Sequence, residues 1–228
     1  MGKSVVVLGD TGSGKSSSIE NLDPKSTLVI SVIKGKDLPF RGSRKVWNRE
    51  NKNLVSFDSY QDILNALKYT DEKTPDVKTI VIDDARYLMV KEFFSRAKEN
   101  GYVKFTEIAM HFQELLRLVE NVREDLTVVL MLHDDDVESE KIIVKKKVKL
   151  TGKLVEEQYN PLEGTAICLY ACCTLSKEAS TPTYQFYTNK TWINGIEIPA
   201  KSPKGMFETI TIPNDLSLVV KAIEEYYG

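Results

Sequence analysis

The sequence has little of what marks several large classes of protein. Three cysteines are too few, and odd in number, for a disulfide-stapled secreted domain. Lysine and arginine (31) nearly balance aspartate and glutamate (33), so the formal net charge is −2. This balance excludes a histone-like polycationic nucleic-acid binder, but it leaves local basic patches open. No stretch approaches the roughly 20 apolar residues of a membrane helix, so we expect no membrane partner.

The cysteines and the N-terminal residues indicate where the chain works. Cys168, Cys172 and Cys173 lie in the apolar stretch ICLYACC and are interpreted as small core residues. A zinc site would need further ligands, and neither histidine of the chain is close to them in sequence. The apolar run at residues 4–8 is too short for a signal peptide. These features predict a protein of the reducing cytoplasm.

The chain does contain a regular alternation of buried strands and helices. Short, continuous apolar runs predict buried strands at residues 4–9, 26–33, 54–57, 79–83 and 126–132. Helical patterns are expected at residues 14–21, 62–69, 106–123 and 213–227, and from the strand at 79–83 to Asn100. Ser59 with Asp62 is expected to cap the helix at 62–69, and Gly101 is expected to be a left-handed cap after Asn100.

The last third of the chain has a different character. An acidic loop is expected at residues 134–140, followed by extended segments at 141–150, 166–174 and 183–187. Strands that alternate with helices predict an α/β fold with a mostly parallel sheet and antiparallel strands added late. At roughly 100–200 residues per domain, we expect one domain over residues 1–228.

A phosphate-binding loop is the strongest local signal. Residues 9–16 read GDTGSGKS and fit G-x-x-x-x-G-K-[ST] directly after a predicted strand. The glycines let backbone N–H groups surround a phosphate, Lys15 supplies a cation to the β/γ oxygens, and the Ser16 hydroxyl is a Mg²⁺ ligand. The candidate ATP-binding residues are Gly9, Asp10, Thr11, Gly12, Ser13, Gly14, Lys15, Ser16 and Ser17.

Polar residues follow two later strands. The run Ile80-Val-Ile-Asp83-Asp84 ends in two carboxylates, and a strand-end aspartate is the usual second Mg²⁺ partner of a phosphate loop, so Asp83 is the candidate. Asp84 either polarises the attacking water or caps the next helix. His133 ends the strand LMLH, where it either contacts the γ-phosphate and its water or is structural.

Two segments are candidates for contact with single-stranded DNA, each with a plainer alternative. Lysines after the acidic loop either contact nucleic-acid phosphates or form a solvated face. Aromatics beside a cation in GYVKFTE either stack on bases or pack in the core. The residues are Tyr102, Lys104, Phe105, Lys145, Lys146 and Lys147.

The order of these motifs resembles a known family. The phosphate loop is followed by IVIDD, ARYLMVKEFFSRAKENGYVKFTEIA, a strand ending in histidine, KVKLTGKLVEE and AKSPKGMFE. Over most of the chain this resembles the core-only RecA-like ATPases of bacteriophages, a group implicated in single-strand annealing and recombination. The resemblance implies a RecA core, Mg²⁺-dependent ATP hydrolysis, single-stranded DNA and a single-strand-binding protein as partners, and the host bacterial cytoplasm. It also implies head-to-tail rings or filaments with ATP at the subunit boundary.

The resemblance assigns a role to one further residue, and at one position the sequence departs from the family's pattern. Lys153, in LTGKL, is the candidate for a cation that one subunit presents to its neighbour's γ-phosphate. RecA-like enzymes carry a catalytic glutamate at the end of the second strand. Here that strand ends at Lys34, and no carboxylate comes before Asp37. Asp84 is the substitute base, and if it is not competent the protein is a slow, ATP-dependent switch.

Two other functions remain open at this stage. A small-molecule phosphotransferase is one, because Arg41, Arg44, Lys45 and Arg49 offer a clamp for a phosphorylated acceptor. A later arginine-rich lid, which nucleotide kinases close over ATP, is not found in the sequence. The other is a nucleotide-dependent scaffold that does not hydrolyse. No guanine-reading N-K-x-D segment stands out, which favours ATP over GTP.

Overall fold

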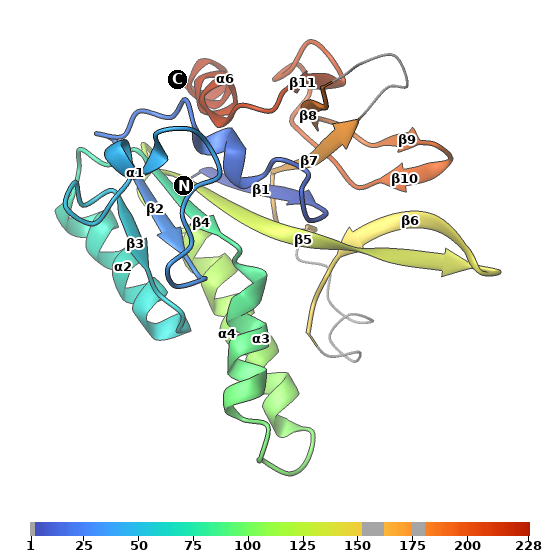
Figure 1. Cartoon of the computed structure of the whole chain (residues 1–228), viewed down its shortest axis with the longest axis horizontal. Helices are drawn as coiled ribbons and strands as arrows, with labels where there is room; N and C mark the ends of the chain where they lie inside the picture. The colour runs from blue at the N-terminus through green and yellow to red at the C-terminus, as the bar shows by residue number, and fades with distance from the viewer. Residues whose placement is uncertain (1–2, 152–161, 175–180) are drawn as a thin grey trace.

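A twisted sheet dominates the computed structural model, which describes residues 3–151, 162–174 and 181–228 (Figure 1). The strands along its main path run in the order β11-β8-β7-β1-β5-β4-β2-β3. They are β1 (Lys3–Gly9), β2 (Thr27–Ser31), β3 (Leu54–Ser56), β4 (Thr79–Asp83), β5 (Thr127–Ser139), β7 (Ile167–Thr174), β8 (Thr183–Tyr187) and β11 (Thr211–Pro213). The remaining strands are β6 (Ile142–Val148), β9 (Thr191–Ile193) and β10 (Ile196–Ile198).

The pairing of these strands confirms the expected architecture. All pairs from β7 through β1, β5, β4 and β2 to β3 are parallel. The pairs β7–β8, β8–β11, β5–β6 and β9–β10 are antiparallel and occur late in the chain. Because β5 lies between β1 and β4, the ends of these three strands meet at one edge of the sheet.

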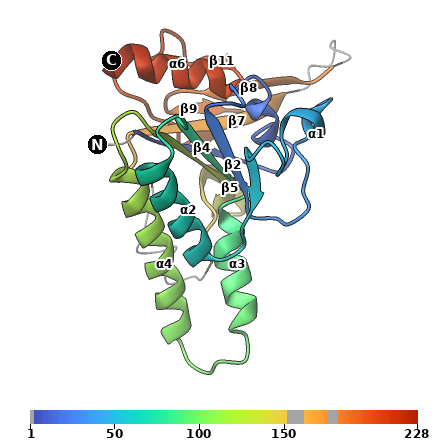
Figure 2. The same ribbon diagram turned by 90° about the vertical axis from the view of Figure 1, so that its left-hand side faces the viewer.

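Helices cover both faces of the sheet (Figure 2). They are η1 (Ser16–Ile19), α1 (Ser43–Val46), α2 (Tyr60–Lys73), α3 (Arg86–Ser95), α4 (Val103–Glu120) and α6 (Leu216–Tyr227). Alternate residues of β1 point to opposite faces, so Val6 packs in the cluster with α2 and α4, while Val5 packs in the cluster with α6. None of the described helices is long and apolar enough to cross a membrane.

The helix expected at residues 14–21 is reduced to the single 3₁₀ turn η1. Three consecutive serines form most of this turn, and the Ser18 hydroxyl donates to the Lys15 carbonyl oxygen at 2.6 Å. Serine side chains that bind nearby backbone compete with helical hydrogen bonding. Pro24, which follows closely, also prevents extension of the helix.

The acidic loop expected at residues 134–140 is instead a strand. β5 continues through it to Ser139 and forms a long hairpin with β6. Asp136 lies opposite Lys146, and their charged atoms are 2.6 Å apart. Aspartate has low β propensity on its own, but opposite charges across a hairpin stabilise the pairing.

The long helix expected to reach Asn100 ends earlier, at Ser95, and α4 begins at Val103 rather than 106. The two helices form a hairpin that projects away from the sheet (Figures 1 and 2). Gly101 has the expected left-handed φ of 89°, but in the connecting loop. The cap at Ser59 is confirmed, since its hydroxyl accepts from the Asp62 N–H at 3.2 Å.

The cysteines are only partly core residues. Cys168 is fully buried on β7, as expected, and its pKa is raised to about 12 by burial. Cys173, near the end of the same strand, is exposed, and all three thiols are free. The cysteines therefore follow the strand from the core to the surface.

Candidate functional site

The candidate site lies at the carboxyl edge of the parallel strands. β1 ends at Gly9, which is paired with His133 on β5, and β4 ends at Asp83. A cavity of about 510 Å³ opens here. Its lining residues are Thr11, Gly12, Gly14, Lys15, Ser16, Ser17, Ile33, Lys36, Pro39, Asp84, Tyr87, His133 and Tyr184. The edge of an α/β sheet where strands end is the usual place for ligands.

The phosphate loop is packed so closely that two of its glycines have no room for a side chain. A Cβ on Gly9 would lie 2.6 Å from the Ala171 carbonyl oxygen. A Cβ on Gly14, whose φ is 92°, would lie 2.7 Å from Cδ1 of Tyr184. No sequence pattern places Tyr184 here, because it belongs to β8 and reaches the loop only through the fold.

Lys15 is buried at the base of the loop. Its ammonium donates to the carbonyl oxygens of Gly9 and Asp10, both at 2.7 Å. Burial lowers the pKa of Lys15, and the negative charge of Asp134, followed by those of Asp84 and Asp83, opposes that shift. The lysine therefore sits among the loop's own oxygens, at the cavity wall where a phosphate would offer stronger acceptors.

Ser16 and the two aspartates converge on one point. The Ser16 hydroxyl donates to Oδ1 of the buried Asp83 at 2.8 Å. The ammonium of Lys36 contacts Ser16 Oγ at 3.1 Å, Asp83 Oδ2 at 2.8 Å and Asp84 Oδ2 at 2.5 Å. A cation thus already occupies the point shared by a hydroxyl and two carboxylates. This is the oxygen set that Mg²⁺ prefers, so these residues fit the expected metal.

Lys36 was not among the residues that the sequence singled out. The only signal was indirect: the acid expected after β2 is replaced by a lysine-containing turn, and Lys34 rather than Lys36 stands at the predicted strand end. Lys34 instead pairs with Asp58 at 3.0 Å and is largely exposed. Which lysine reaches the site depends on the turn that follows β2.

Asp84 is held in an unusual backbone conformation that directs it to the cavity. Its φ is 60°, a left-handed value that costs energy for a residue other than glycine. The N-cap position of α3 is Ala85, and in the described structure no side chain there accepts a hydrogen bond from the backbone N–H groups of the first turn. The interpretation of Asp84 as a helix cap is therefore wrong. Its carboxylate faces Lys36 and lies 3.8 Å from Nε2 of His133.

His133 stands beside the two aspartates with its ring mostly buried. Its ring meets Tyr87 edge to face at 5.8 Å, and Nδ1 is buried with no hydrogen-bond partner among the described residues. Burial, followed by the charge of Lys15, lowers the pKa of His133. The imidazole is therefore neutral at physiological pH and available as a hydrogen-bonding group at the cavity.

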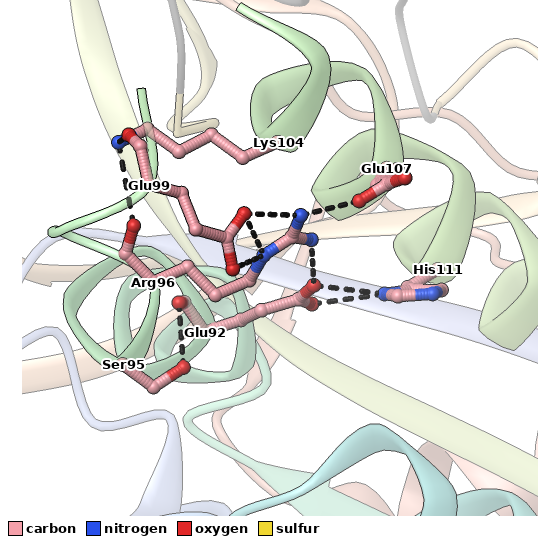
Figure 3. A network of polar contacts seen from close by, with 7 residues as sticks. All are labelled: Glu92, Ser95, Arg96, Glu99, Lys104, Glu107 and His111. Atoms are coloured by element: carbon pink, nitrogen blue, oxygen red, sulfur yellow. Dashed lines mark hydrogen bonds and ion pairs between the residues drawn. The ribbon is translucent and has the colours of Figure 1, made fainter. Parts of the chain in front are cut away.

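The aromatic candidates for DNA contact lie on the α3–α4 hairpin. The Lys104 ammonium donates to the backbone carbonyl oxygens of Arg96 and Glu99, as Figure 3 shows for the polar network there. Phe105 stacks on Phe93 at 5.8 Å. Lys104 and Phe105 thus contribute to the hairpin itself, and Tyr102, 77% exposed, is the candidate that faces solvent.

The lysine candidates lie on β6 and are engaged with acidic residues. Lys145 pairs with Glu197 at 3.0 Å, and Lys146 pairs with Asp136. Lys147 lies opposite Asp135 in the hairpin register. This segment is therefore a charge-paired strand, and the expected contact with DNA stays a prediction.

Lys153, the candidate cation for a neighbouring subunit, lies outside the described residues. The structure therefore gives it no place relative to the cavity.

Comparison with known proteins identifies the family. Residues 1–192 match the family described as an AAA domain. The chain belongs to this family. It is accordingly a P-loop AAA-type ATPase domain, and its mixed, mostly parallel sheet with antiparallel C-terminal strands is the predicted RecA-like fold.

Among solved structures, the AAA domain is similar to a KaiC-like protein of the hyperthermophilic archaeon Pyrococcus horikoshii. The two share 16% sequence identity with a TM-score of 0.44, over 81% of this chain and 77% of the other. No curated protein matches the sequence.

Proposed function

We propose that this AAA domain is a Mg²⁺-dependent ATPase that binds single-stranded DNA and serves recombination, annealing or replication of phage DNA. The observation that carries the ATPase part is that Lys15 and Ser16 line one cavity, with Ser16 donating to the buried Asp83, beside a loop that accepts no side chain at Gly9 or Gly14. Cation, hydroxyl and carboxylate are the three groups that phosphoryl transfer in P-loop proteins requires.

Each residue has a distinct task in this proposal. The loop amides and Lys15 bind and orient the phosphates, and Ser16 with Asp83 would hold Mg²⁺. When bound, the metal would neutralise charge on the transferring phosphate. Asp84, 3.8 Å from His133, is the group that orients water and accepts its proton. The neutral His133 lines the same cavity and offers a hydrogen bond to the γ-phosphate or its water, so it senses whether the γ-phosphate is present.

The DNA part of the proposal rests on the motif resemblance, with Tyr102 as an exposed aromatic and the charge-paired lysines of β6 as cations that phosphates would take over from their acidic partners. We further propose assembly into a ring or filament with ATP at the subunit boundary, and cooperation with a single-strand-binding protein. The phosphotransferase alternative is less well supported, because Arg44 of its clamp already pairs with Asp37 at 2.5 Å.

Phosphate release from Mg-ATP, with and without single-stranded DNA, tests the proposal. We expect stimulation by DNA in the wild type, background activity in Lys15→Ala, and unchanged activity in Lys68→Ala, an exposed lysine on α2. Turnover that appears only with a nucleoside or nucleotide acceptor would instead indicate a phosphotransferase. Nucleotide binding without turnover, unaffected by Asp84→Asn, would indicate a scaffold.

A further inference from the structure

Lys36 occupies the point where the metal ligands of the site converge. Its ammonium is within hydrogen-bond distance of Ser16, Asp83 and Asp84, and no other described lysine or arginine forms an ion pair with either aspartate. The ammonium neutralises part of a carboxylate pair that is almost completely buried, since Asp83 is 1% and Asp84 6% exposed.

The turn that carries Lys36 is fixed on both sides. Before it, the Val32 N–H donates to the Asp83 carbonyl oxygen at 3.2 Å, and Gly35 adopts a φ of 74° that turns the chain back over the site. After it, Leu38 is 4% exposed and its carbonyl oxygen accepts from the Ser43 hydroxyl at 2.8 Å. The backbone on both sides of Lys36 is thus fixed, and this holds its ammonium at the two aspartates.

The charges explain what this arrangement does. Two neighbouring carboxylates without a counter-ion repel each other in a buried site and attract a divalent cation strongly. A lysine on the same oxygens weakens both effects, and a metal ion must displace it to reach them. A bound nucleotide would change this balance, because its phosphates offer the displaced ammonium new acceptors.

We propose that Lys36 is a resident cation of the metal subsite, which weakens Mg²⁺ binding to the nucleotide-free protein and yields its place more readily when nucleotide is bound. This inference rests on the proposed Mg²⁺-dependent function and adds to it a residue that positions Asp83 and Asp84. It makes entry of metal and nucleotide coupled events. It also links the turn after β2 to the state of the site.

Binding of Mn²⁺ to the full chain without nucleotide, followed by the electron paramagnetic resonance signal of the free ion, tests the inference. Lys36→Met keeps the aliphatic stem and removes the charge, and we expect it to bind Mn²⁺ about tenfold more tightly than the wild type or better. The gain should disappear in Lys36→Met combined with Asp83→Asn. Lys36→Arg, which keeps the charge, should bind Mn²⁺ as weakly as the wild type.

Lys34→Met is the matched control, because it removes the same charge two positions away. Equal Mn²⁺ affinity of Lys36→Met and wild type, or equal tightening by Lys34→Met, would overturn the inference. Should Lys36→Met fail to fold, labelling of the wild type with an amine reagent decides: saturating Mn²⁺ must raise the labelling of Lys36 and not that of Lys34, and an unchanged Lys36 refutes the proposal.

These measurements separate the inference from the proposed function. If the wild type releases no phosphate from ATP but Lys36→Met gains Mn²⁺ affinity, the resident cation stands and the ATPase proposal fails. If the wild type hydrolyses ATP and Lys36→Met binds Mn²⁺ no better, the ATPase proposal stands and the resident cation fails.

Discussion

At the scale of single residues, the phosphate loop contains two glycines with different constraints. Gly12 and Gly14 both have positive φ, but nothing among the described atoms lies within 4 Å of a Cβ built on Gly12. A Cβ on Gly14 would meet Tyr184 and Asn214 at 2.7 and 3.2 Å. The first position therefore needs glycine for its backbone alone, and the second also needs it for space.

This difference predicts unequal effects of alanine. Gly12→Ala should cost about 1 kcal/mol of unfolding free energy, the penalty of a left-handed residue. Gly14→Ala should cost more and also lose nucleotide affinity, measured with a fluorescent ATP analogue alongside urea denaturation. Adding Tyr184→Ala to Gly14→Ala should recover part of the loss. Equal effects of the two single changes would show that packing against Tyr184 is unimportant.

His133 makes the folding stability of the nucleotide-free protein depend on pH. Burial and the charge of Lys15, with smaller contributions from Arg86 and Lys36, hold its pKa below the ordinary value, and Asp84 opposes them. The unfolded chain therefore takes up its proton at a higher pH than the folded chain does. The stability from this group is complete above the ordinary histidine pKa of about 6.5 and is lost as the pH falls towards the lower folded-state pKa.

Urea denaturation between about pH 5 and pH 8 should show this loss in the wild type and a flatter profile in His133→Gln. The control is His111→Gln, since His111 is the only other histidine and its side chain is 46% exposed. An unchanged slope in His133→Gln would contradict the assignment.

At the scale of elements, a polar network joins the end of the α3–α4 hairpin that projects beyond the core. Arg96 binds Glu92 at 3.1 Å, Glu99 at 2.7 Å and also Glu107, while His111 binds Glu92 at 2.9 Å (Figure 3). One guanidinium thus joins the end of α3 to the start of α4. Three carboxylates that share it would repel one another without it.

We therefore expect Arg96→Gln to loosen the end of the hairpin and leave the sheet intact. Amide hydrogen exchange should become faster between residues 96 and 107 and stay unchanged in β1 and β4. Lys98→Gln, an exposed lysine in the same loop, is the matched control. Unchanged exchange in Arg96→Gln would show that apolar packing alone holds the hairpin.

The β5–β6 hairpin allows a direct test of the DNA proposal. Charge reversal of Lys145, Lys146 and Lys147 to glutamate should weaken single-stranded DNA binding. It should also reduce the slope of log affinity against log salt by about 2, since each phosphate contact to a single strand contributes about 0.7. Reversal of Lys68 and Lys73 on α2 serves as the control. An unaltered slope would remove β6 from the DNA contact.

These two hairpins also show where local sequence patterns are insufficient to predict secondary structure. The apolar strands were found nearly to the residue, as at Thr79–Asp83, because burial on both faces leaves a continuous apolar run. Residues 134–140 are predicted as a loop, but β5 continues through them to Ser139, because what stabilises aspartates in a strand is the opposite charge on β6, not their own propensity. The ends of α3 and α4 were misplaced for a similar reason, since contacts between the two helices set them.

At the scale of the whole molecule, the proposed assembly makes a prediction about mixed subunits. If Lys153 acts on a neighbour's nucleotide, Lys15→Ala and Lys153→Ala are each inactive alone. An equal mixture should recover about a quarter of wild-type ATPase activity, because a head-to-tail interface draws one residue from each subunit. Sedimentation in Mg-ATP measures the assembly itself. A monomer in all conditions, or a mixture without recovery, would rule out the shared site.

The sequence by itself determined the family-level chemistry: a phosphate loop, an acidic strand end and an alternating α/β pattern. These signals are local, since eight consecutive residues form the loop and short apolar runs form the strands. Only the tertiary structure decided which groups meet there. Lys36 reaches Asp83 across 47 positions of sequence, and Tyr184 of β8 packs over Gly14. Such contacts follow from the order of strands in the sheet and from the turn after β2, which pairing over long distances fixes and no local pattern encodes.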